Sequence, residues 1–341
     1  MKTRTRLTVL ITAISRRVTL LEAFRGALEA GGFRGRVLAT DVNPWSPGVH
    51  MADAAYAVPL STAPDYVERV LDVCRREQVD VVVPTIDDEL PVFASALSRF
   101  AEEGIRVIVS PLETTLACND KVRTCEILRA AGVSAAASYR RETLPADLDP
   151  PLFVKPRVGR GSVSAFQART RRELEFFLDY VPDPCIQECL DGPEFTLDLF
   201  CDLEGHPVSV VPRERVVIRS GVIDRGRTVK NPHLLELGIA CARALPFVGP
   251  INIQCRMHQG RPVVFEINPR FSGGIGLTLR AGADFAAWSL QLALGRRLAP
   301  RIGEFTDNLW MTSHESALYL PAQARFVLAN PELPHAVGAR P

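Results

Sequence analysis

Oxygen-bearing and basic side chains alternate along the segment VVFEINPR. Glu266, Asn268 and Arg270 occupy every second position, and because strand side chains alternate between faces, all three would project to one side. Such alternation is also typical of an ordinary half-exposed strand. A carboxylate beside an amide oxygen nevertheless suits Mg²⁺, so the pattern predicts either a plain strand or one wall of a metal site.

The segment GPINIQCR, just upstream, has the same alternation. Asn252, Gln254 and Arg256 would share one face, apolar residues would lie on the other, and MHQGRP would form the hairpin turn between the two strands. The hairpin would then direct Gln254, Glu266 and Asn268 at one point. Because Mg²⁺ normally completes its octahedron with waters and substrate phosphates, the metal is expected to arrive with a nucleotide.

Two lysines have settings that suit a polyphosphate. Lys155 ends an apolar strand and is followed by GRGS, whose free backbone N–H groups and flexibility could close over an anion. A snorkelling lysine before a surface turn would have the same sequence. Lys121 lies in the first turn of a predicted helix, where the dipole disfavours a cation unless an anion is present. One lysine in a first turn is common, so each segment alone leaves both interpretations open.

An arginine-rich segment follows residue 212. Bidentate pairing with a guanidinium is a strong way to hold a substrate carboxylate, although most arginines of a hairpin are solvated. We expect one or two of these side chains at the site, with the candidates Arg213, Arg215 and Arg219.

Further groups could hold the polar ends of a substrate. Ser272 and Gly273 could offer backbone N–H donors to an anion, or could form a simple turn. Asp87 and Glu89 could pair with an ammonium, or could serve only as the cap and first turn of a helix.

Composition limits the class of protein. The chain has 341 residues, 47% hydrophobic residues and a formal net charge of +1, which is typical of a protein with sizeable cores and two or three domains. No basic block suggests nucleic acid, and no apolar run is long enough for a membrane span. Eight cysteines without metal-site spacing indicate reduced thiols and a cytoplasmic location.

Through residue 110, short apolar strands alternate with amphipathic helices, including those expected over residues 18–30 and 89–103. This alternation predicts an α/β domain with a parallel sheet, whose ligands lie beyond the carboxyl ends of the strands. The first strand runs into AISRR. Because it lacks a GxGxxG loop, a nicotinamide cofactor is not expected.

After residue 110 the pattern predicts an α+β fold. Helices are expected over residues 119–132, 171–178 and 285–294, with a Pro-rich link at 144–151 and a strand-like stretch at 309–320. The expected domains are 1–110 and 111–320, with a lid subdomain at about 150–190 and a loose tail at 321–341.

Five separated motifs, NDK, FVKP with GRGS, QECLDGPEFTLDLF, INIQCR and VFEINPRFSGG, occur in an order and spacing similar to those of ATP-grasp enzymes. The chain resembles the carbamoyl-phosphate-synthase-like and pyrrolysine-biosynthesis-type (PylC-like) ligases of that superfamily, over about residues 5 to 320. The resemblance implies a Rossmann-like pre-ATP-grasp domain followed by an ATP-grasp domain.

The resemblance also implies roles for individual residues. Lys121 and Lys155 look like the lysines that hold the ATP phosphates, and Lys155, Asn268 and Arg270 like the catalytic groups. Glu194 looks like the carboxylate that binds ribose. The covering loop would include Arg157, Gly159, Gly161 and Ser162, the adenine linker Gln187, Glu188, Cys189 and Leu190, and the metal site Gln254, Glu266 and Asn268.

The activity that the resemblance implies is an ATP-dependent carboxylate–amine ligase. An acyl phosphate would form and be attacked by an amine, with ADP and phosphate released; ATP and Mg²⁺, as one or two ions or replaced by Mn²⁺, would be the cofactors. Amino acids are the expected substrates, and a homodimer stays open. Alternatives are a carboxy-phosphate-forming or kinase-like enzyme and a non-catalytic ATP-binding regulatory module.

The chain also departs from the family pattern. The turn after the first strand lacks the glycines usual in many relatives, which leaves substrate binding by that domain open. The sequence has no second ATP-grasp copy and no biotin or glutaminase segment, and its length is expected to exclude a full carbamoyl phosphate synthase.

Overall fold

The computed structural model describes residues 6–159, 161 and 163–320. They form two compact units: the first includes residues 6–85 and Ala96–Val107, and the second comprises Ile86–Ser95 and the described part of Ile108–His314. Ser162 of the predicted covering loop and the predicted tail at 321–341 lie outside the described residues.

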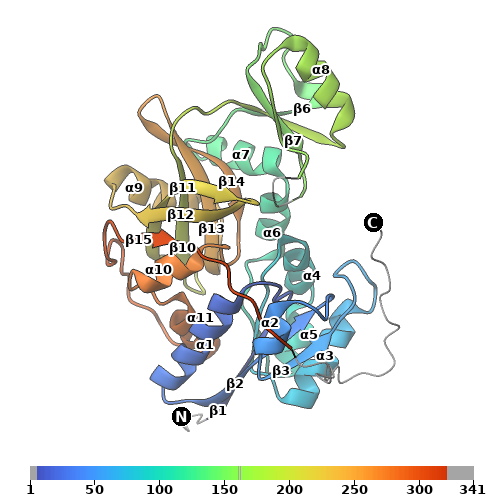
Figure 1. Ribbon diagram of the computed structural model, residues 1–341, viewed down its shortest axis with the longest axis vertical. Helices are drawn as coiled ribbons and strands as arrows, with labels where there is room; N and C mark the ends of the chain where they lie inside the picture. The colour runs from blue at the N-terminus through green and yellow to red at the C-terminus, as the bar shows by residue number, and fades with distance from the viewer. Residues whose placement is uncertain (1–5, 160, 162, 321–341) are drawn as a thin grey trace. The chain divides into compact units, whose positions relative to one another are not determined.

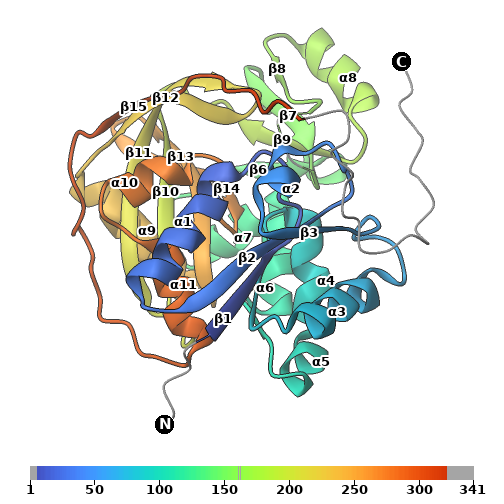
Figure 2. The same ribbon diagram turned by 60° about the horizontal axis from the view of Figure 1, so that its bottom comes forward.

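The first unit contains a parallel sheet of five strands in the order β3-β2-β1-β4-β5. The central strand is apolar, with Val9, Leu10 and Ile11 fully buried, as expected for a strand covered on both faces. Figure 2 shows β1, β2 and β3 side by side. The strands are β1 (Arg6–Ile11), β2 (Arg34–Asp41), β3 (Ala54–Ala57), β4 (Val81–Val83) and β5 (Arg106–Val107). The predicted α/β class is confirmed.

The helices within the first 110 residues agree in part with the sequence pattern. Helix α1 (Val18–Ala30) has the predicted bounds. The single helix expected over residues 89–103 is wrong: a 3₁₀ turn η1 (Asp87–Glu89), α4 (Leu90–Ser95) and α5 (Leu97–Glu102) replace it, because Ala96 leaves the helical conformation at φ −104°, ψ 8°. Helices α2 (Pro47–Met51) and α3 (Tyr66–Glu77) were not predicted.

The second unit contains a six-stranded sheet in the order β14-β13-β10-β11-β12-β15, and all its neighbouring strands are antiparallel. The expected hairpin is present as β13 and β14, whereas the strand expected at 309–320 is limited to β15 (Figure 1). The strands are β10 (Glu194–Cys201), β11 (Pro207–Arg219), β12 (Val222–Thr228), β13 (Gly249–His258), β14 (Arg261–Asn268) and β15 (Trp310–Thr312).

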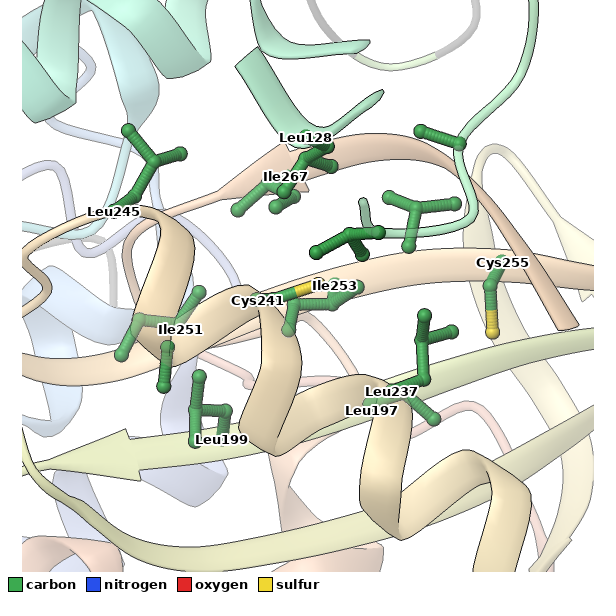
Figure 3. Packing of buried hydrophobic residues seen from close by; sticks show 14 of the residues in the cluster. Leu128, Leu197, Leu199, Leu237, Cys241, Leu245, Ile251, Ile253, Cys255 and Ile267 are labelled. Atoms are coloured by element: carbon green, nitrogen blue, oxygen red, sulfur yellow. The ribbon is translucent and has the colours of Figure 1, made fainter. Parts of the chain in front are cut away.

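One face of this sheet forms the main core of the unit. Leu197 and Leu199 of β10, with Ile251 and Ile253 of β13, pack against helix α9 (Pro232–Ala244), whose Leu237 lies in the same cluster (Figure 3). Helices α6 (Leu112–Asn119) and α7 (Lys121–Ala130) complete this layer against β14. Because side chains alternate, the polar residues of the same strands lie on the opposite face.

Two short helices cover one end of that polar face. Phe200 of β10 contacts Phe285 and Trp288 of α11 (Phe285–Ala293), with ring centroids 5.1 Å and 5.6 Å apart. Thr278 of α10 (Ile275–Arg280) donates a hydrogen bond to Asp198 of the same strand. The rest of the polar face holds the residues expected to do chemistry.

A smaller antiparallel sheet has the order β6-β9-β7-β8 and packs against helix α8 (Figure 1). Its elements are β6 (Ser138–Arg140), β7 (Leu152–Pro156), β8 (Phe166–Ala168), α8 (Arg171–Tyr180) and β9 (Pro184–Glu188). Strand β6 lies before the Pro-rich link, so the predicted lid range of 150–190 omits one strand of this sheet.

All eight cysteines are free thiols, and seven are buried while Cys189 is half-buried. Burial raises the pKa of the Cys185 thiol to about 12. None of the helices in the described part of the chain combines the length and apolarity of a membrane span.

Candidate active site

The predicted metal-binding side chains are neighbours on strands β13 and β14. In the strand register Gln254 is opposite Glu266 and Asn252 is opposite Asn268, and a bulge follows Gln254. Asn268 Nδ2 donates to Glu266 Oε1 at 3.1 Å. The amide hydrogen bond orients the carboxylate, and the hairpin brings two amides and one carboxylate together as the alternation predicted.

Lys155 reaches this group from the four-stranded sheet. Its Nζ lies 3.8 Å from Glu266 Oε2 and 3.5 Å from the carbonyl oxygen of Phe265, and 5.1 Å from the centroid of the Phe265 ring. The side chain is 8% exposed. Lys155 is therefore a buried cation beside the predicted metal carboxylate, and the interpretation as a snorkelling surface lysine does not describe it.

Lys121 begins α7, immediately after its N-cap. Asp120 accepts hydrogen bonds from the backbone N–H groups of Val122 and Arg123, both at 3.1 Å, which explains why the helix starts here and not at residue 119 as predicted. Burial lowers the pKa of Lys121, and Lys155 lowers it further while Glu266 opposes the shift. The two lysines and Glu266 therefore share one electrostatic environment.

The predicted covering loop is attached to Lys121. Lys121 Nζ donates to the carbonyl oxygen of Gly159 at 2.7 Å, and its backbone N–H donates to the carbonyl oxygen of Arg157 at 3.1 Å. Gly159 has φ +139°, which side-chain-bearing residues rarely adopt. Gly161 also has a positive φ, of +71°. The glycines thus allow a backbone path that places carbonyl groups beside the lysine.

Arg157 itself is engaged at the base of the loop. Its guanidinium pairs with Asp183 at 2.8 Å and with Asp120 at 3.2 Å. The phosphate contact predicted for this side chain stays a prediction, since its guanidinium is paired with these two carboxylates.

The predicted adenine linker includes the last two residues of strand β9 and the two residues after it. Gln187 is buried and its Nε2 donates to Ser138 Oγ at 2.9 Å and to the carbonyl oxygen of Phe265 at 3.2 Å. Glu188 Oε1 accepts from the backbone N–H of Ala137 at 2.8 Å. These two side chains hold the strands together, whereas Cys189 and Leu190 beyond the strand are half-buried.

Glu194, the predicted ribose carboxylate, lies between two arginines. Arg215 Nη1 donates to its Oε1 at 2.5 Å and Arg256 Nη2 to its Oε2 at 2.6 Å. Burial lowers the pKa of Arg215, and the charge of Glu194 opposes this shift. Arg215 was expected to bind a substrate carboxylate but pairs with the predicted nucleotide carboxylate. Arg256 was not among the candidates, although its alternation with Asn252 and Gln254 placed it on this face.

Arg213 is an internal anchor. The residue is 1% exposed; its Nε donates to Asp198 Oδ2 at 2.7 Å, and its Nη2 to Asp198 Oδ1 at 3.2 Å and to Ser272 Oγ at 2.9 Å. It therefore holds the turn at Ser272 and Gly273 and presents almost no surface to a substrate. Arg219 lies at the tip of the β11–β12 hairpin, paired in register with Val222, and the structure does not bring it to the lysines.

Arg270 makes an ion pair with Asp87 of η1. Its Nη2 and Nε lie 2.8 Å and 3.1 Å from Asp87 Oδ2, and its Nη1 donates to the carbonyl oxygen of Phe271 at 3.0 Å. Asp87 also acts electrostatically on Lys121. Glu89 is buried at 2% exposure. Of the two acidic candidates, Asp87 thus joins the charged cluster of Lys121, Lys155, Glu266 and Arg270.

The donor set fits a magnesium-bound polyphosphate. Gln254, Glu266 and Asn268 offer oxygen ligands with one carboxylate, which suits a cation that shares its coordination with phosphates. In the adjoining register position, the Oδ1 atom of Asn252 is buried without a hydrogen-bond partner among the described residues. The cluster's three cationic and two anionic side chains leave one net positive charge for an anion.

Two family models match the chain. Residues 9–108 match the PylC-like N-terminal domain, and residues 181–316 match a domain described as ATP-grasp in the biosynthetic pathway with Ter operon. The carbamoyl phosphate synthase large chain of Clavibacter michiganensis is 26% identical over 299 residues, which cover 77% of this chain and 26% of that protein. The chain therefore spans about a quarter of the length of this relative.

Solved structures with similar folds include an L-amino acid ligase from Bacillus licheniformis, with TM-score 0.69 and 20% identity over 87% of this chain and 76% of that one. The biotin carboxylase domain dimer of Hydrogenobacter thermophilus 2-oxoglutarate carboxylase, in complex with MgADP and bicarbonate, has TM-score 0.68 and 18% identity over 89% and 73%. The chain is an ATP-grasp superfamily protein with a PylC-like N-terminal domain, and a distant relative of carbamoyl phosphate synthase large chains.

Proposed function

We propose that this protein is an ATP-dependent carboxylate–amine ligase that forms an amide or peptide bond through an acyl phosphate. The observation that carries the proposal is the convergence of side chains from separate segments. Lys121 of α7, Lys155 of β7, and Glu266 and Asn268 of β14 form one polar cluster, in which the lysines and the asparagine are buried and the glutamate is half-buried. A non-catalytic nucleotide module has no need of this complete set.

The chain's own residues can hold the reacting groups. Lys121 and Lys155 would bind the phosphates of ATP, and Arg270 would spread the charge on the transferred phosphoryl group. A divalent cation held by Gln254, Glu266 and Asn268 would supply further counter-charge to the phosphates. The loop with Gly159 and Gly161 would exclude water from the acyl phosphate.

The proposed reaction balances in two steps. The substrate carboxylate oxygen bonds to the γ-phosphorus while the bond to ADP breaks and ADP leaves with its electron pair. The nitrogen of a neutral amine then bonds to the acyl carbon, and phosphate leaves with the electron pair of the broken C–O bond. One proton leaves the nitrogen for phosphate or water. Little covalent participation by the protein is required.

Two similarities to known proteins support an amine as the co-substrate. The N-terminal residues match a PylC-like domain, and the L-amino acid ligase of Bacillus licheniformis shares the fold. A carboxy-phosphate-forming reaction is the second candidate, because the 2-oxoglutarate carboxylase domain of similar fold was solved with bicarbonate.

The test supplies the full chain with Mg²⁺, ATP, the twenty standard amino acids and, separately, bicarbonate. We expect ADP release in step with a product whose mass is the sum of two substrates less one water. ADP release that depends on bicarbonate alone would replace the ligase with the carboxy-phosphate reaction, and a stable phosphorylated product would indicate a kinase. The Glu266→Gln variant should abolish ADP release with the far-ultraviolet circular dichroism unchanged.

A further inference from the structure

Only one of the two carboxylate oxygens of Asp87 accepts hydrogen bonds from the described residues. Arg270 directs both Nε and Nη2 at Oδ2, at 3.1 Å and 2.8 Å. Oδ1 is buried and has no hydrogen-bond partner among the described residues, and Asp87 as a whole is only 7% exposed. A buried carboxylate oxygen without a donor is costly, and a bidentate pair with Arg270 would have engaged both oxygens.

Oδ1 of Asp87 lies beside the proposed reaction centre. Arg270 follows Asn268 by two residues and is anchored to the carbonyl oxygen of Phe271. The charge of Asp87 is also felt by Lys121. A ligand group that pairs with Oδ1 would therefore lie next to the arginine that is proposed to spread the charge of the transferred phosphoryl group.

The chemistry of a carboxylate oxygen selects the kind of ligand group. Anionic phosphates and carboxylates are repelled by Asp87, whereas an N–H donor would satisfy Oδ1, most strongly when it is charged. On the proposed function, which this inference deepens, the second substrate is the group with N–H donors. We propose that Asp87 binds the amino group of the second substrate through Oδ1, while its Oδ2 holds Arg270.

The charges of the cluster then impose an order of binding. Lys121, Lys155 and Arg270 outnumber Asp87 and Glu266, so the cluster alone carries a net positive charge that repels an ammonium. Nucleotide phosphates and a substrate carboxylate reverse that sign. The amine therefore binds after ATP and the carboxylate, when an acyl phosphate is ready for it.

The experiment compares two nucleophiles in three proteins. Wild type, Asp87→Asn and Asp88→Asn receive Mg²⁺, ATP and the carboxylate identified among the standard amino acids. The acyl phosphate is trapped by saturating hydroxylamine, a small neutral nucleophile, or consumed by the amino acid that serves as amine. The Asp87→Asn change retains a side-chain oxygen for Arg270 but places an NH₂ group where Oδ1 was. Asp88, exposed on the same 3₁₀ turn, is the matched control.

We expect the ratio of kcat/KM for the amine to the rate of hydroxamate formation to fall about ten- to a hundredfold in Asp87→Asn. The cause of this fall should be a higher KM for the amine. In Asp88→Asn the ratio should stay at the wild-type value. If Asp87 only positions Arg270, both reactions fall together and the ratio is unchanged, which overturns the inference while leaving the ligase intact. Absence of hydroxamate with wild type would overturn the proposed function itself.

Discussion

Replacement of Arg213 by methionine should be among the most destabilising single changes in the second unit. Arg213 and Asp198 are each 1% exposed and are joined through two hydrogen bonds of 2.7 Å and 3.2 Å. Methionine fills much of the volume but leaves Asp198, among the described residues, with only the hydroxyl of Thr278 as a side-chain hydrogen-bond donor. Removal of one partner of a buried ion pair costs about 3–5 kcal/mol. For a domain of this size, that lowers Tm by about 6–20 °C.

Thermal unfolding followed by near-ultraviolet circular dichroism measures the effect. The exposed Arg219, whose Nη2 lies 3.5 Å from Asp224 Oδ1, supplies the matched control, because Arg219→Met should cost at most about 1 kcal/mol. The double variant Arg213→Met/Asp198→Asn should recover part of the loss, since no unpaired charge is left. If Arg213→Met melts within about 2 °C of Arg219→Met, the buried pair does not stabilise the unit as described.

Three further predictions concern the nucleotide site and the backbone. Burial lowers the pKa of Lys121 from 10.5, and a bound phosphate should raise this pKa again. MgADP binding at alkaline pH should therefore be accompanied by proton uptake, which calorimetry in buffers of different ionisation enthalpy measures. The Lys121→Met variant should lose this proton uptake. Glu266→Gln should weaken Mn²⁺ binding, measured by electron paramagnetic resonance, by at least the roughly tenfold typical of an outer-shell partner; unchanged affinity would remove the carboxylate from the metal site. Gly192→Ala should destabilise the protein by about 1–3 kcal/mol in denaturant unfolding, because the new Cβ would lie 1.7 Å from the carbonyl oxygen of Met257. The control Gly26→Ala, in open space within α1, should stabilise the protein by up to about 1 kcal/mol. Equal effects of the two changes would contradict the close contact at Gly192.

Local patterns were sufficient for much of the fold. The alternation of Ile251 and Ile253 with Asn252 and Gln254 predicted both the strand and its apolar face, and the packing of the two isoleucines in the core cluster confirms the assignment. The start of α7 was missed by two residues because Asp120, rather than an earlier residue, supplies the cap. The break at Ala96 carried no proline or glycine signal and could not be read from periodicity.

The partners across the sheet could not be predicted, because the alternation within one strand contains no strand order. Glu194 meets Arg215 and Arg256 only because β10 lies between β11 and β13. The same order places Asp198 beside Arg213. Arginines predicted to bind substrate thus became partners of acidic residues on the neighbouring strand, and only the assembled sheet distinguishes the two uses.

Cys189 gives the protein a selective chemical handle. The other seven thiols are buried, and thiolate formation and reagent access both decline with burial. A maleimide fluorophore should therefore react at this one position of the native protein, within the expected adenine linker and directly after strand β9. Its emission would follow nucleotide arrival in real time without the introduction of any new residue.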